Sequence, residues 1–381
     1  MNIINYLIID GQEYLLLFFF LIINTVIESS KELKRYKNIT FYFSSVVLAC
    51  FIGFRWETGT DWESYKELFD TIQLNWTFLL NVYHFDIGYV FFNAIIRTFT
   101  NNYTIFLIFN SGITIFFLSK LILKVSPYPN LSLLFFYTNY MIAQFMGSNR
   151  RMMAMVFCLW LFYYVYQNKK KLSYFSLGSA FAFHRSSIIG IITYFVPAKI
   201  ISINKTLLFL FIALIIGLLQ LPAKFIEISG NFLSTFMNNP LVEKMVFYSE
   251  TNEDHLVYST GSLVISTFLA VLKRSILLIF YFYIIKKNKI DNITSFLYNI
   301  YIYGFIGYLF FIGSFFQMLS AYFALVEVLL IGKMYSYTTG KIKVAFCFVL
   351  CFYGLLQMMN ALNVYPELYM PYLPFWTTTS R

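Results

Sequence analysis

Long apolar runs separated by short polar segments fill most of this chain. Most of these runs approach the roughly 20 residues that an α-helix needs to cross a bilayer. The helices that the apolar pattern predicts lie at about 12–29, 38–55, 104–122, 129–147, 150–167, 206–222, 262–285, 294–313, 315–332 and 343–362. The pattern therefore predicts an all-α, polytopic membrane protein with about ten transmembrane helices, in a single membrane domain over residues 1–381.

Two further segments do not fit a simple membrane span. Residues 84–100 are amphipathic and contain Asp86, while residues 172–198 carry the polar sequence AFHRSS in their middle. We expect 84–100 not to cross, and 172–198 to form a re-entrant hairpin with His184 at its turn. Non-helical backbone is tolerated at membrane depth only where it lines a cavity or is buried in protein. The hairpin therefore indicates a site.

Lysine sets the predicted sidedness, because positive charge is enriched in cytoplasmic loops. Of the 20 lysines, 16 fall in six clusters that can all be cytoplasmic if both ambiguous segments behave as described. This arrangement places both termini and the loops at about 56–103 and 223–261 outside. The formal net charge of +10 is then explained by cytoplasmic loops, and gives no reason to expect a nucleic-acid partner.

Arginine does not follow lysine. Of the 8 arginines, Arg35 alone lies in a lysine cluster. In the predicted topology, Arg55, Arg150, Arg151 and Arg185 lie at outer helix ends or at the hairpin turn. The planar guanidinium is suited to bidentate binding of phosphate oxygens, and charge inside a membrane protein is costly. These arginines are therefore candidate anion-binding residues.

Each candidate stretch also has a structural interpretation. From Arg55 to Tyr65, Gly59 allows a tight turn and Asp61 is placed to cap a following helix, but the same residues suit an interfacial anchor. Two cations at a helix N-terminus, Arg150 and Arg151, oppose the helix dipole and so favour a bound anion over a plain surface patch. A lone His in an apolar stretch is more often a satisfied core residue than a catalyst.

Three short motifs in a fixed order carry a resemblance to a known family. They are Arg55-x-x-x-Gly59-x-Asp61-Trp62-x-x-Tyr65, Arg150-x-x-x-Ala154, and Phe183-His184-x-Ser186. In this order they resemble the EpsG-like branch of the Wzy polysaccharide polymerases of bacterial inner membranes. The segment FDIGYVFFNAIIR resembles the acidic-x-Gly-Tyr segment of that family, and YPELYMPYLPFW its aromatic C-terminal end.

The resemblance implies a GT-C-like glycosyltransferase of O-antigen or capsule assembly, with its active site facing the periplasm. The donor and the acceptor would both be glycans on undecaprenyl diphosphate. The glycan would move in one block onto an acceptor hydroxyl, with inversion and without a metal or other cofactor. The implied partners are these two lipid-linked glycans, the lipid bilayer and a chain-length regulator.

The resemblance also implies roles for single residues. It assigns diphosphate binding to Arg55, Arg150 and Arg185. Arg151 and Arg274 are further candidates, because Gln317 stands where many relatives carry an arginine. The expected catalytic residues are His184 and Asp61, and the expected acceptor or glycan contacts are Trp62, Tyr65, Ser186 and Tyr89.

Two other functions remain open at this stage. An O-antigen ligase shares the donor and the chemistry, but ligases usually carry a large outer loop late in the chain. A flippase or other transporter of lipid-linked oligosaccharides would show internal repeats and helices broken at the membrane midplane. The sequence has no evident repeat, and no GxGxxG, Walker, HExxH or CxxC motif that would indicate nucleotide or zinc chemistry.

Overall fold

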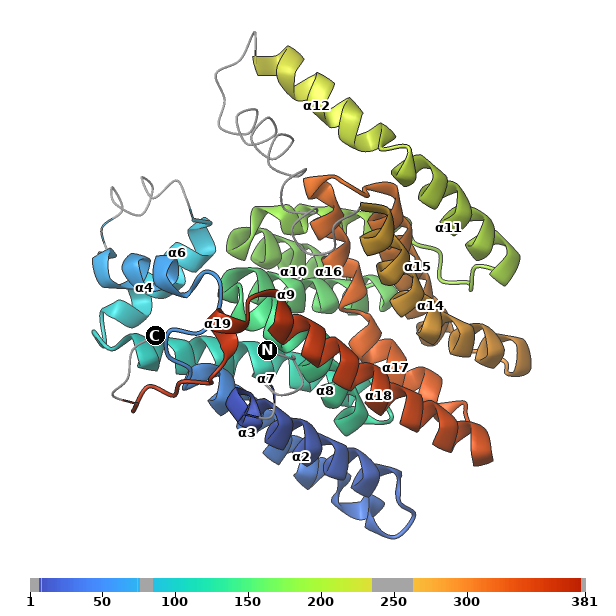
Figure 1. Ribbon diagram of the computed structural model, residues 1–381, viewed down its shortest axis with the longest axis horizontal. Coiled ribbons are helices and arrows are strands. Elements are labelled where there is room, and N and C mark those ends of the chain that lie inside the picture. The colour runs from blue at the N-terminus through green and yellow to red at the C-terminus, as the bar shows by residue number, and fades with distance from the viewer. Residues whose placement is uncertain (1–6, 8, 74, 76–84, 235–262, 378–381) are drawn as a thin grey trace. The chain divides into compact units, whose positions relative to one another are not determined.

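The computed structural model describes residues 7, 9–73, 75, 85–234 and 263–377 (Figure 1). Helices dominate these residues, and the described ranges contain no β-strand beyond one isolated bridge, between Arg55 and Pro374. The chain divides into two compact units, Met1–Ile191 with Val328–Arg381, and Ile192–Glu327. Most of the predicted outer loop 223–261 lies outside the described residues.

The first unit holds every candidate site residue except Arg274. Its helices are α2 (Gln12–Ser29), η1 (Leu33–Tyr36), α3 (Lys37–Gly53), α4 (Trp62–Thr71), α6 (Ile87–Arg97), α7 (Tyr103–Val125), α8 (Pro129–Phe136), η2 (Tyr137–Met146), α9 (Asn149–Tyr166), α10 (Lys170–Phe183), α18 (Gly340–Val364) and α19 (Pro366–Tyr369). The 3-10 helix η3 (Arg185–Phe195) begins in this unit, and α17 (Glu327–Ser336) lies almost entirely within it. Helix α9 packs against α10, and α3 against α7.

The second unit is a smaller helical bundle. It contains α11 (Ile203–Leu218), α12 (Leu221–Ser234), α14 (Leu263–Lys287), α15 (Asn292–Phe310), η4 (Phe315–Leu319) and α16 (Ser320–Ala324). One pair of buried polar groups within it is Tyr281 and Glu327: the Tyr281 hydroxyl donates to Oε1 of Glu327 over 2.9 Å. Such pairing satisfies polar atoms that would otherwise be costly to bury.

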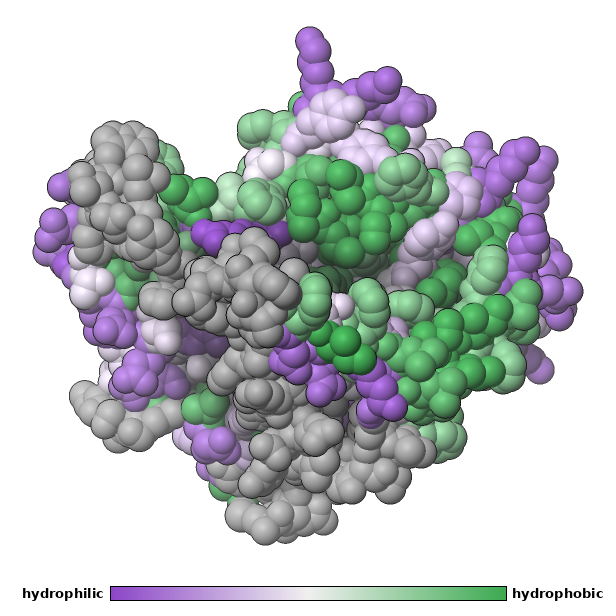
Figure 2. All heavy atoms as spheres, turned by 90° about the horizontal axis from the view of Figure 1, so that it is seen from above, coloured by the Kyte–Doolittle hydropathy of each residue, from purple (hydrophilic) through white to green (hydrophobic). Residues whose placement is uncertain are grey.

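The outward faces of several helices are apolar, as a lipid environment requires. On α2, Leu16, Phe19 and Ile23 are more than half exposed, whereas Tyr14 and Leu21 on the opposite face are fully buried. Figure 2 shows hydrophobic side chains covering broad areas of one face, next to hydrophilic groups. Water would disfavour so much exposed apolar surface, so these faces indicate contact with lipid tails.

Among the residues that the structure describes, six helices are long and apolar enough to cross a membrane, or seven if the pair α11–α12, bent by 49°, counts as one span. The chain is therefore a multi-pass membrane protein. The predicted helices at 38–55, 129–147 and 150–167 are present as α3, as α8 with η2, and as α9, but do not meet the same criterion. The number of about ten crossings stays a prediction.

The two ambiguous segments have distinctive structures. Helix α6 has only 11 residues, about 16 Å of helix, which is too short to cross a bilayer alone. Helix α10 ends at Phe183, and η3 follows after His184. Along η3, Gly190 lies beside Leu177 of α10, with 3.7 Å between the Leu177 Cδ1 atom and a Cβ built on the glycine. The chain thus doubles back at His184, as the predicted hairpin requires.

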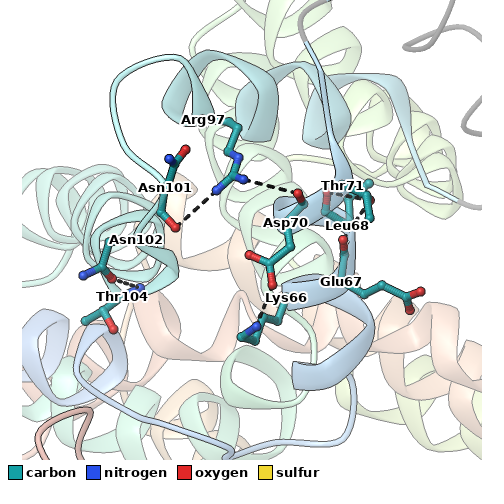
Figure 3. Close-up of polar contacts among 9 residues, drawn as sticks. All are labelled: Lys66, Glu67, Leu68, Asp70, Thr71, Arg97, Asn101, Asn102 and Thr104. Carbon is teal, nitrogen blue, oxygen red and sulfur yellow. Dashed lines mark hydrogen bonds and ion pairs between the residues drawn. The ribbon is translucent and has the colours of Figure 1, made fainter.

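Arg97 fixes α4 against the turn between α6 and α7 (Figure 3). Its guanidinium donates to the carbonyl oxygens of Asp70 and Asn101 over 3.3 and 3.2 Å, and lies 5.3 Å from the centre of the Phe69 ring. Asn102 then caps α7 by accepting a bond from the Thr104 amide. This arginine therefore has a structural role that accounts for its place away from the lysine clusters.

Candidate functional site

The loop after α3 is shaped by Gly59. Its φ of +110° lies in a region that side chains with a Cβ rarely adopt. A Cβ atom at this position would lie 2.0 Å from the carbonyl oxygen of Met146, the last residue of η2. Only glycine therefore allows the loop to rest directly on the end of η2, immediately before the start of α9.

The C-terminal segment closes over the same loop (Figure 1). The Trp56 amide donates to the Leu373 carbonyl over 2.7 Å, and the Phe375 amide to the Phe54 carbonyl over 2.8 Å. The Tyr372 hydroxyl donates to the Phe51 carbonyl at the end of α3. The aromatic, proline-containing C-terminus thus pairs with residues 54–56 and covers Arg55.

Arg55 is enclosed by protein. The residue is 1% exposed, and its guanidinium donates to the carbonyl oxygens of Ile52 and Thr58 and to Oδ1 of Asn149. These three bonds join the end of α3, the following loop and the first turn of α9. The structure thus places Arg55 beneath the loop. Its described hydrogen bonds go to two backbone carbonyls and to the side-chain amide of Asn149.

Asp61 precedes α4, as the sequence predicts, but its side chain does not cap the helix. Its carboxylate accepts instead from the Thr60 hydroxyl and the Tyr65 hydroxyl, each over 3.1 Å. The Tyr65 hydroxyl also lies 2.7 Å from Oγ of Ser148. The expected capping role is therefore wrong, because the turn at Gly59 directs this carboxylate toward Tyr65 and the α9 junction.

Helix α9 begins with polar groups that lack the usual side-chain cap. Ser148 precedes the helix but makes no capping bond, since its hydroxyl lies against Tyr65. Arg150 and Arg151 lie in the first turn, and Nε of Arg151 is buried without a hydrogen-bond partner. Free helix N–H groups and guanidinium donors together favour an anion at this point.

Asp86 brings two of the candidate arginines together. Its Oδ2 accepts from Nη1 of Arg150 over 2.9 Å, while its Oδ1 accepts from the Arg185 amide over 3.1 Å and lies 3.3 Å from Arg185 Nε. The Arg150 guanidinium also lies 5.2 Å from the centre of the Phe85 ring. The side chain of Arg185 is 65% exposed, so the cluster of Asp86, Arg150 and Arg185 is accessible from outside the protein at Arg185.

His184 lies at the hairpin turn, between α10 and η3. Its Nδ1 is 2.6 Å from Oγ of Ser186, which fixes the orientation of the ring. Burial lowers the pKa of His184 to about 3, with further lowering by the nearby charges of Arg150 and Arg151. The imidazole is therefore neutral at physiological pH and close to two of the candidate arginines.

The remaining predicted site residues lie elsewhere. Trp62 and Tyr89 are buried in an aromatic cluster formed by α4, α6 and α7, together with Tyr65. Arg274 belongs to the second unit, where its guanidinium lies 3.7 Å from the centre of the Tyr308 ring on α15. The structure thus gathers Arg150, Arg151, His184, Arg185 and Ser186, with Asp61 on the loop before α4 and the Tyr65 hydroxyl of α4 beside Ser148 at the start of α9.

Sequence reasoning did not assign two residues of this arrangement, Asp86 and Asn149. Asp86 stands in the acidic-x-Gly-Tyr segment, so the motif carried a signal without indicating its partners. Asn149 directly precedes Arg150, but its bond to Arg55 joins positions 94 residues apart.

The comparisons with known proteins agree with the motif order. No curated protein and no solved structure gave a significant match. The sequence profile described as the EpsG family matches residues 38–375, which include the loop after α3, the start of α9, the hairpin and the C-terminal segment. The chain belongs to the EpsG family.

Proposed function

We propose that this protein is a polysaccharide polymerase. It transfers a glycan in one block from undecaprenyl diphosphate onto a hydroxyl of a repeat unit carried by the same kind of lipid. The reaction takes place at the periplasmic face of the inner membrane. Family membership supports a polymerase-type membrane protein, and the arrangement around Asp86 carries the proposal at the level of residues.

The single supporting observation is the convergence of Arg150 and Arg185 on one carboxylate, with His184 beside them. The first turn of α9 and the hairpin turn lie far apart in the sequence, and their cationic groups meet here. Guanidinium groups held side by side match the oxygens of a diphosphate.

The leaving group explains why cations would accelerate the reaction. As the anomeric C–O bond breaks, negative charge grows on the diphosphate. Arginines in a partly dry site stabilise that charge more in the transition state than in the ground state. We assign diphosphate contact to Arg150, Arg185 and Arg151, whose buried Nε has a free donor.

Arg55 takes a different part in this proposal. Because its guanidinium is buried and bonded to Ile52, Thr58 and Asn149, it stabilises the backbone that carries the site. By holding Asn149, it fixes the first turn of α9 and hence the backbone that carries Arg150. Trp62 and Tyr89 act in the same indirect way, through the aromatic cluster that packs α4 against α6 and α7.

The proposed transfer is a single displacement at the anomeric carbon. The acceptor hydroxyl oxygen bonds to the anomeric carbon on the face opposite the diphosphate, and the C–O bond to the diphosphate breaks with its electron pair. The hydroxyl proton passes to His184, or to Asp61 as the alternative base. Binding of the anionic donor offsets the charges of Arg150 and Arg151, which raises the pKa of His184 and makes it a better base.

Reconstitution tests this function. Purified protein in liposomes receives synthetic undecaprenyl-diphosphate-linked repeat units, and product length is read on a gel. Polymer formation that continues in EDTA supports the arginine mechanism. Activity lost in EDTA and restored by magnesium or manganese contradicts metal independence, and movement of the lipid-linked unit across the bilayer without any polymer favours a transporter.

A further inference from the structure

The Asp86 carboxylate is bound by residues from two segments of the chain, the first turn of α9 and the hairpin turn. One carboxylate oxygen binds Arg150 of α9, and the other binds both the backbone amide and Nε of Arg185 at the hairpin turn. The side chain of Asp86 is only 8% exposed. A carboxylate that accepts bonds from two guanidinium groups occupies the kind of place that a phosphate group would take.

The backbone around Asp86 is fixed in position. Asp86 precedes α6, and its carbonyl oxygen accepts bonds from the amides of Tyr89 and Val90, while its side chain makes no capping bond. At Gly88 the helix touches α10 so closely that a Cβ would lie 2.8 Å from the backbone of Ala182. The start of α6 is therefore held against the end of α10, and the carboxylate has little freedom to leave the arginines.

We propose that Asp86 is a positioning residue that holds Arg150 and Arg185 side by side for the diphosphate, and that it stays paired with them when the substrate binds. This inference rests on the proposed function, because it assumes that the arginines bind a lipid diphosphate. In the empty protein, Asp86 keeps two cations together that would otherwise repel each other. In the loaded protein, its charge weakens the hold on the diphosphate, so that the product can leave.

This role predicts the direction in which the affinity for a diphosphate changes when Asp86 is replaced. Removing the negative charge takes away repulsion between Asp86 and the bound diphosphate, so affinity for the anion rises. If Asp86 only held the arginines in place and did not repel the ligand, its loss would loosen the arginines and weaken binding. The direction of the change in affinity therefore separates the two roles.

The test measures binding of farnesyl diphosphate to the full-length protein in detergent by calorimetry. We expect Asp86→Asn to bind about tenfold more tightly than wild type, since one full charge is removed next to the ligand. Asp86→Ser removes the same charge with a smaller side chain, so a folding defect in one variant leaves the other informative. Asp86→Glu keeps the charge and should bind within about threefold of wild type.

Asp70→Asn is the matched control. Asp70 is 41% exposed and pairs with Lys66 on α4, so its loss should leave the affinity unchanged. In the liposome assay, Asp86→Asn should lower both KM and kcat, because the arginines bind more strongly and release the product more slowly.

The outcomes separate the inference from the proposed function. If wild type binds farnesyl diphosphate, and both uncharged variants bind it equally or less tightly, the role of Asp86 is overturned while the polymerase remains supported. If wild type does not bind the probe at all, both are overturned. If the uncharged variants bind more tightly but no glycan is transferred in liposomes, the role of Asp86 stands and the polymerase fails.

Discussion

Nη2 of Arg55 donates to Oδ1 of Asn149 over 2.6 Å, and this bond ties the end of α3 to the first residue of α9. Two further bonds from the same guanidinium reach the carbonyls of Ile52 and Thr58. The residue that opens the first motif is thus joined to the residue that precedes the arginines of the second. The order of the motifs along the chain reflects a physical connection between them.

Replacing Arg55 should therefore reduce stability first. Arg55→Lys cannot reach three acceptors in the same geometry, and each buried partner left unbonded costs about 1–3 kcal/mol. We expect a clear fall in the melting temperature of the detergent-solubilised protein, with activity lost in proportion. Arg185→Lys is the control for stability, because that side chain is 65% exposed. An Arg55→Lys protein that melts like wild type yet is inactive would place Arg55 in the chemistry.

Gly59 offers a second test of how the loop supports the site. Gly59→Ala introduces a Cβ 2.0 Å from the Met146 carbonyl and strains a residue with a φ of +110°. The loop has to move away from η2, so we expect lower stability together with loss of transfer activity. Gly178→Ala on α10, where a Cβ meets nothing within 4 Å, should behave like wild type or be slightly more stable. Normal activity in Gly59→Ala would show that the loop does not need this close approach.

The apolar pattern predicts most of the helices, because hydrophobic length is a local property of the chain. It predicts α2, α7 and α18 within a few residues, and it marks 84–100 and 172–198 as exceptions. Local patterns do not predict contacts between distant segments. The burial of Arg55 depends on the C-terminal segment returning to residues 54–56, and the direction of the Asp61 carboxylate depends on the turn at Gly59. The pairing of Asp86 with Arg150 likewise depends on how α6 packs.

The predicted topology can be checked by cysteine labelling in a variant that lacks the four native cysteines. Single cysteines are placed at positions 67 and 170, on α4 and at the start of α10. A membrane-impermeant reagent added from the periplasmic side should label position 67 and not position 170, which becomes accessible after permeabilisation. Labelling of position 170 in sealed cells contradicts the assignment of the lysine clusters to the cytoplasm.

The state of His184 predicts a dependence of stability on pH. Its pKa in the folded protein is about 3, against an ordinary value of 6.5, so between these values the unfolded chain binds a proton that the folded protein does not. Stability is therefore lost as the pH falls through this window, by about 1 kcal/mol between pH 6.5 and 5 once the partial exposure of the ring is allowed for. Thermal melts of wild type and His184→Gln at pH 7.5 and 5 should show the larger fall for wild type. Equal falls contradict a neutral, buried imidazole.

Replacing Arg150 best distinguishes a functional role of these arginines from a structural one. A cation in the first turn opposes the helix dipole, so its removal should not weaken α9. The Asp86 carboxylate keeps its bonds to Arg185, so Arg150→Ala does not leave it without a partner. We therefore expect a protein that inserts and purifies normally, with polymerisation reduced about 10²–10³-fold, as for the loss of one strong transition-state contact.

A lysine at position 150 tests whether the planar shape of the guanidinium is needed in addition to its positive charge. Arg150→Lys keeps the positive charge but cannot bind Asp86 and a phosphate through a planar fork, so it should restore little activity. Lys170→Ala, which removes one of three adjacent lysines at the start of α10, is the control and should be close to wild type. If Arg150→Ala is well folded and makes polymer of normal length, the arginines around Asp86 are structural anchors. The transporter function would then gain support, because transport requires no charge stabilisation on a departing diphosphate.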